Sequence, residues 1–203
     1  MVPLILMSMV LLFLLLVLVV LVFSPNARAQ RARAAGRLSV ALQIYVRRHA
    51  PAQVVACLQE DLPSWPVRAQ LILAFEELIQ LETSAQVALA AGAPQAFATS
   101  FTDVSQHALE NLLQTADRLW AVAVQRVDYA VLQQGLERED ERLQRLVGAI
   151  RRAREELALI TLADAHAADF DHVTDHLRLL ADMARHDRGG QQIEAVSEWL
   201  NQG

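Results

Sequence analysis

The sequence contains no lysine, and arginine supplies all 18 of its basic residues. It has a single cysteine, Cys57, so an intrachain disulfide is excluded, and the apolar neighbours of Cys57 predict a buried thiol. It also lacks a P-loop and the G-x-G-x-x-G, G-x-S-x-G and C-x-x-C motifs of common nucleotide-binding, hydrolase and redox sites. These absences favour a non-enzymatic protein over an enzyme.

Acidic residues are missing from the first part of the chain. None precedes Glu60, although six arginines do, whereas the chain from Glu60 onward carries 12 basic and 23 acidic residues, a net charge of −11. We expect the arginines that follow the first apolar segment to attract anionic lipid headgroups, and the acidic remainder to exclude nucleic acid as a partner. These membrane-proximal basic residues are Arg28, Arg31, Arg33 and Arg37.

Charge of either sign is absent from Val2 to Phe23. As a helix, this stretch would be about 33 Å long, which is enough to cross a hydrocarbon core of about 30 Å. The arginines that follow predict an N-terminus outside and the rest of the chain in the cytoplasm. We expect an uncleaved signal anchor in a bacterial inner membrane. The alternative is a signal peptide cleaved near Ala27-Arg28-Ala29, although only Met1 precedes the apolar run, which is longer than usual for such a peptide.

Runs of alternating polar and apolar residues are also lacking, and most of the seven glycines and six prolines fall between helical patterns. We therefore predict an all-α chain with a transmembrane anchor (1–24), a basic juxtamembrane linker (25–35) and an antiparallel helical bundle (36–203). The expected helices cover 36–49, 51–60, 66–91, a stretch from between 94 and 103 to 134, 136–160, 165–188 and 191–200.

Apolar residues recur at steps of three and four in the long helices, as in bundle cores and coiled coils. One stripe comprises Val67, Leu71, Ala74, Leu78, Leu81, Ala85 and Ala88, and another comprises Leu143, Leu146, Ile150, Ala153, Leu157 and Ile160. Gly135 predicts a turn between two antiparallel helices that pair like a coiled coil, although one long helix through this glycine is the alternative.

Four of the six histidines cluster near the C-terminus. Within this cluster Asp169, His172 and His176 follow helical spacing on one face, where they could bind a divalent metal such as Zn²⁺. The alternative, which we favour, is a solvated shoulder beside the apolar stripe of Phe170 and Val173, with no cofactor. Asp103, His107 and Glu110 also share a helical face, and here too we expect a solvated surface.

These patterns together predict a membrane-anchored, non-enzymatic scaffold or interaction module that faces the cytoplasm. Its partners would be membrane lipid and either another protein or a second copy of the chain. The alternatives are a metal-binding sensor or hydrolase-like protein that uses the Asp/His-rich helix, and an exported helical protein if the N-terminus is cleaved.

Overall fold

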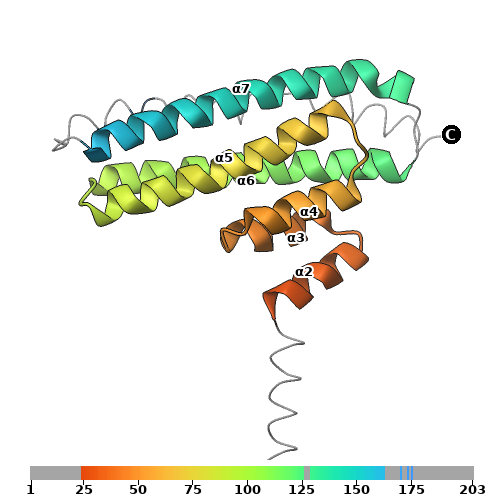
Figure 1. Cartoon of the computed structure of the whole chain (residues 1–203), viewed down its shortest axis with the longest axis horizontal. Helices are drawn as coiled ribbons and strands as arrows, with labels where there is room; N and C mark the ends of the chain where they lie inside the picture. The colour runs from red at the N-terminus through yellow and green to blue at the C-terminus, as the bar shows by residue number, and fades with distance from the viewer. Residues whose placement is uncertain (1–23, 126–128, 163–169, 171–172, 174, 176–203) are drawn as a thin grey trace, which may run out of the picture.

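The computed structural model describes residues 24–125, 129–162, 170, 173 and 175 (Figure 1). These residues form six α-helices and no strand, which confirms the all-α prediction. The helices are α2 (Pro25–Ala34), α3 (Leu38–Arg47), α4 (Pro51–Asp61), α5 (Pro66–Ala90), α6 (Gln95–Val124) and α7 (Tyr129–Leu162). Val2–Phe23 lies outside the described residues, and within them no helix is long and apolar enough to cross a membrane.

Proline marks the start of three of these six helices. Pro25, Pro51 and Pro66 each occupy the first turn, where the missing N–H group loses no helical hydrogen bond. At the start of α2, Ser24 is extended and its hydroxyl accepts a hydrogen bond of 3.1 Å from the backbone N–H of Ala27. A new helix therefore begins at Pro25.

Helices α5, α6 and α7 form a bundle, below which α3 and α4 lie in Figure 1, with α2 lowest. Contacts between α5 and α7 join residues 74 apart in sequence, Glu77 to Arg151 and Gln80 to Arg154, so these two helices run parallel. In the hydrogen bonds between α6 and α7, residues with higher numbers on α7 bond to residues with lower numbers on α6. This pair of helices is therefore antiparallel. The neighbours α6 and α7 are thus antiparallel, as predicted, but α7 packs most extensively on α5, which is not its neighbour in sequence.

The predicted stripes form the core. All seven stripe residues of α5 are buried, and on α7 every stripe residue from Leu143 to Leu157 is buried as well. Phe97 on α6 packs against Phe101 and Phe170, with ring centroids 5.9 and 5.4 Å apart. Phe170 and Val173 are helical and buried, in agreement with the predicted stripe of the next helix. The bundle is therefore held by a continuous apolar interior.

Of the two alternatives at Gly135, the long helix is confirmed and the turn is wrong, because α7 runs from Tyr129 to Leu162 without interruption. One glycine inside a helix costs only about 1 kcal/mol. Leu132 and Leu136, on either side of it, are both 4% exposed, and burial of two such side chains outweighs this cost. The connection between α6 and α7 lies within 125–128, where the sequence contains neither glycine nor proline.

The stretch that we predicted as a linker forms helix α2. It has no apolar stripe, but alanine and arginine favour helix strongly, and Ala29 is completely buried. Gly36 connects α2 to α3 with a positive φ of 71°, so that the two helices pack as an antiparallel hairpin. Residues 25–34 are therefore helical and contribute the buried Ala29 to the core.

We expect Gly36→Ala to lower the free energy of unfolding by about 2 kcal/mol. An added Cβ would sit in a strained backbone conformation and only 3.0 Å from Cη2 of Trp120 on α6. Gly92→Ala is the matched control, since its φ of 101° is also positive but no atom lies within 4 Å of the added Cβ. Urea unfolding should show the larger loss for Gly36→Ala, and equal losses would contradict the close packing of Gly36 on Trp120.

Candidate functional site

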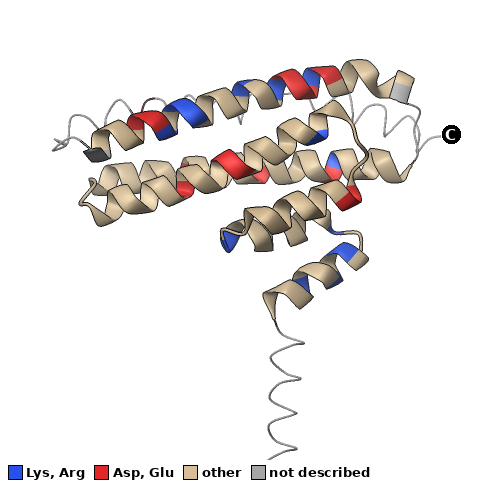
Figure 2. Ribbon diagram, viewed as in Figure 1, with Lys and Arg blue, Asp and Glu red and all other residues tan. Residues whose placement is uncertain are grey.

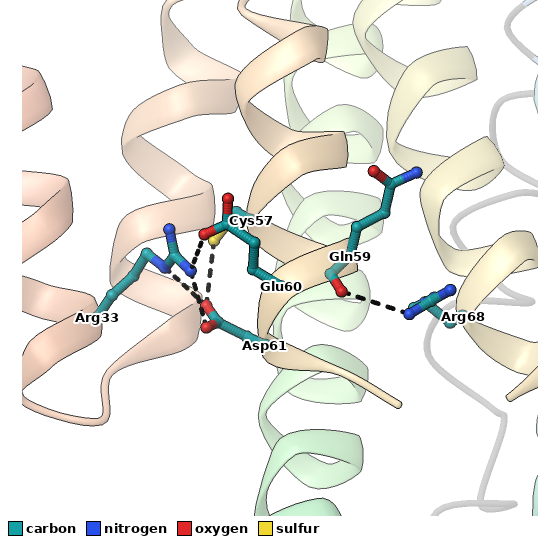
Figure 3. A network of polar contacts seen from close by, with 6 residues as sticks. All are labelled: Arg33, Cys57, Gln59, Glu60, Asp61 and Arg68. Atoms are coloured by element: carbon teal, nitrogen blue, oxygen red, sulfur yellow. Dashed lines mark hydrogen bonds and ion pairs between the residues drawn. The ribbon is translucent and has the colours of Figure 1, made fainter. Parts of the chain in front are cut away.

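A forked ion pair joins α2 to α4 (Figure 3). The guanidinium of Arg33 donates through Nε to Oδ2 of Asp61 (2.7 Å) and through Nη2 to Oδ1 of the same carboxylate (2.8 Å). Nη2 also donates to Oε2 of Glu60 at 2.8 Å, and the thiol of Cys57 lies 3.6 Å from Oδ2 of Asp61. We call these four residues the Arg33 clamp. Two parallel N–H···O bonds fix both the distance and the orientation of the two helices.

Burial and hydrogen bonding raise the pKa values of three side chains in and beside the clamp. The pKa of Arg33 is raised, chiefly by its hydrogen bond to Asp61, so its positive charge is permanent. Burial raises the pKa of the Cys57 thiol to about 12. Burial also raises the pKa of Tyr45, which packs from α3. Cys57 is 1% exposed and protonated at neutral pH, which confirms the predicted buried thiol and makes it unreactive.

Stability should therefore fall with rising alkalinity. The unfolded chain loses the Cys57 proton near the ordinary pKa of about 9, whereas the folded chain holds it until about pH 12. The free energy of unfolding therefore falls between about pH 9 and pH 12, by at most about 1.4 kcal/mol per pH unit for one proton. The raised pKa of Tyr45 lowers the free energy of unfolding further above pH 10. Denaturant titrations from pH 8 to 12 should show this slope, and Cys57→Ala should reduce it; an equal slope in this variant would contradict the assignment.

Two further polar contacts attach α3 to the bundle. The backbone N–H of Ser39 donates to Oδ1 of Asp117 on α6 at 2.9 Å, which satisfies a free donor in the first turn of α3. At the other end of α3, Nε2 of His49 lies 3.4 Å from Oε2 of Glu82 on α5. The second oxygen of Glu82 accepts a hydrogen bond from Ser105 on α6. Helices α2–α4 are thus attached to the bundle at both ends of α3.

Charged side chains are also buried inside the bundle. Glu139 and Arg142 of α7 are 3% and 7% exposed and form an ion pair of 2.9 Å. The hydroxyl of Thr115 donates to Glu139 (3.0 Å), and Arg142 donates to Oδ1 of Asn111 (2.6 Å) and to Thr115 (2.8 Å). This group of four residues, the α6–α7 polar cluster, fixes the register of the two helices because each partner is available at one position only.

The structure separates the four arginines predicted to meet lipid. Arg28, Arg31 and Arg37 are exposed, whereas Arg33 is half-buried in the clamp and its charge is matched by Glu60 and Asp61. The guanidinium of Arg33 therefore bonds within the domain, and its contact with lipid stays a prediction. Sequence reasoning missed the pairing with Asp61, since nothing in a local pattern identifies a partner 28 residues away.

The predicted metal ligands Asp169, His172 and His176 lie outside the described residues. Asp103, His107 and Glu110 are described: His107 contacts the backbone oxygen of Asp103 at 2.7 Å, and Glu110 accepts a hydrogen bond from Gln106. Within residues 24–125 and 129–162, no group of three or more His, Cys, Asp or Glu side chains is placed to hold a metal ion. Local helical contacts account for this second trio.

A small open cleft of about 170 Å³ lies between the start of α5 and the first half of α7. It is lined by Pro66, Val67, Leu136, Glu137, Asp140 and Glu141. Small-molecule sites are larger and mostly apolar, at about 300–1,000 Å³. The acidic residues of the cleft lie beside the N-terminus of α5, where negative charge is favourable for a helix dipole. The carboxylates of the cleft are therefore placed where they stabilise α5.

Comparison with protein-family models, with curated proteins and with solved structures finds no match for this chain. Its function has to be inferred from the sequence and from the contacts described above.

Proposed function

We propose that this chain is a membrane-tethered, non-enzymatic platform that holds a protein partner, or a second copy of itself, at the cytoplasmic face of a bacterial inner membrane. The charge-free segment Val2–Phe23 supports a single anchor, and the arginines after it support a cytoplasmic domain.

Metal binding at Asp169, His172 and His176 remains the alternative, and metal analysis of the untagged chain tests it.

The observation that carries this proposal is the position of α2. The folded domain starts at Ser24, directly after the apolar segment, and the Arg33 clamp fixes α2 to α4. A flexible tether would let a domain move freely above the membrane. Here the domain is attached close to the bilayer with a fixed internal arrangement, as suits a platform that presents one surface to a partner.

Helix α7 supplies the surface that we assign to the partner. Its 34 residues extend about 51 Å along one edge of the bundle. This helix carries charged residues of both signs along its length, whereas the only charged residues of α2 and α3 are basic (Figure 2). Near its two ends Val131 and Leu159 are 63% and 67% exposed. A long helix with mixed charge and exposed apolar side chains suits pairing with another helix.

Crosslinking of the full chain in its native membrane, followed by purification and mass spectrometry, tests the proposal. The soluble comparison should start at Ser24, since a fragment from Gly36 would lack Ala29 and Arg33. We expect one stoichiometric partner, or crosslinks between copies, that weaken in Leu159→Arg but persist in the control Val40→Arg on α3. A full chain that crosslinks to nothing would contradict the platform role.

A further inference from the structure

The α2–α3 hairpin brings two distant arginines back to the start of the domain. Arg48 follows Ser24 by 24 residues in sequence, yet its Nη1 donates a hydrogen bond of 2.8 Å to Oδ1 of Asn26 in the first turn of α2. Arg47 precedes it in the last turn of α3. Both side chains are exposed. They therefore lie at the end of the hairpin where the apolar segment joins the domain.

This end of the hairpin is strongly basic. Residues 24–59 contain six arginines and no acidic residue, and in the clamp Arg33 pairs with Glu60 and Asp61 of α4. Arg28, one turn into α2, is exposed like Arg47 and Arg48. Ser24 is a non-helical N-cap and Pro25 is the first residue of α2, so α2 starts as a helix of its own.

We propose that Arg28, Arg47 and Arg48 form a surface for anionic phospholipid headgroups, which turns the end of the α2–α3 hairpin onto the bilayer. This inference rests on the proposed anchor. Guanidinium groups bind phosphate through paired hydrogen bonds, and a basic residue near an anionic leaflet strengthens adsorption by about fivefold. The acidic remainder of the chain is then directed away from the membrane, so that α7 stays available to a partner.

The test uses the full chain reconstituted in nanodiscs of phosphatidylcholine, alone or mixed with phosphatidylglycerol. A fluorophore on Val40→Cys reports docking by energy transfer to a headgroup-labelled acceptor, because Val40 is exposed and lies seven residues before Arg47 on one helical face. Buried Cys57 stays unlabelled. We compare R47Q/R48Q with R145Q/R152Q, a control that removes the same charge from exposed positions of α7.

In anionic discs, R47Q/R48Q should lower the ratio of docked to undocked domain by about 25-fold, and the control should leave it unchanged. Equal transfer in both variants, or equal losses, would overturn the proposed surface. Abolition of docking by millimolar inorganic phosphate would show a site for a free anion in place of a headgroup surface, and would overturn it too. A chain that the discs do not retain would instead contradict the anchor itself.

Discussion

Replacing Glu139 by leucine should lower the free energy of unfolding by about 3 kcal/mol. Glu139 is 3% exposed and supplies the only carboxylate oxygen within the α6–α7 polar cluster, where it faces Arg142 at 2.9 Å. Its loss removes the 2.9 Å ion pair from a guanidinium that also donates to Asn111 and Thr115. Breaking a buried ion pair by removing one partner is strongly destabilising, so the variant should unfold at markedly lower urea concentration.

The double replacement Glu139→Leu/Arg142→Leu separates charge from packing. We expect it to lie within about 1 kcal/mol of the parent, because two apolar side chains can replace a buried ion pair with little net change. Arg142→Leu alone should lose about 3 kcal/mol, so the two single losses cannot add. Additive losses in the double variant would contradict a direct coupling between the two charges.

Asp61→Ala should cost about 2 kcal/mol and release α2 from α4. Asp61 accepts both bonds of the forked pair with Arg33, and each of the two side chains is 23% exposed, so water only partly replaces the lost contact. Trypsin should then cut after Arg31 and Arg33 much faster than in the parent, since a protease needs a locally unfolded segment.

Glu60→Gln is the matched control for Asp61→Ala. Glu60 also bonds to Arg33, but its side chain is 64% exposed, so its pairing should contribute less than about 0.5 kcal/mol. Trypsin cleavage within α2 should stay slow in this variant. Rapid cleavage in the parent, or equal cleavage in both variants, would mean that the clamp does not hold α2.

Sequence patterns predicted the elements better than their pairing. Proline positions gave the starts of α4 and α5 correctly, and three-and-four spacing identified the buried face of α5. These features are local, since a helix start or an apolar stripe depends on residues within a few turns. The parallel pairing of α5 with α7 was missed because it depends on contacts 74 residues apart, such as Glu77 with Arg151.

The turn at Gly135 and the linker before Gly36 were predicted for separate reasons. Glycine is a poor helix former, which favoured a turn at Gly135, but α7 continues through it. Helix α2 was taken as a linker because it has no apolar stripe. Its signals were Ser24-Pro25 and the high helix propensity of alanine and arginine. Its stabilising contact with Asp61 is tertiary, so the sequence could not show it.

Pairing of Arg33 also changes which arginines can face lipid. The clamp pairs Arg33 with Asp61, and the hairpin brings Arg48 into hydrogen-bond contact with Asn26. Arg48 lies 22 residues after Asn26 in the sequence, but the antiparallel hairpin returns the end of α3 to the start of α2.

Alkaline carbonate extraction of native membranes tests the membrane-tethered platform most directly. The extraction removes proteins held by charge or by partners but leaves a spanning helix in the bilayer. We predict that the full chain stays in the membrane pellet while a chain that begins at Ser24 is released. Release of the full chain, or a mature chain that has lost Val2–Phe23, would contradict the anchor and the platform role that depends on it.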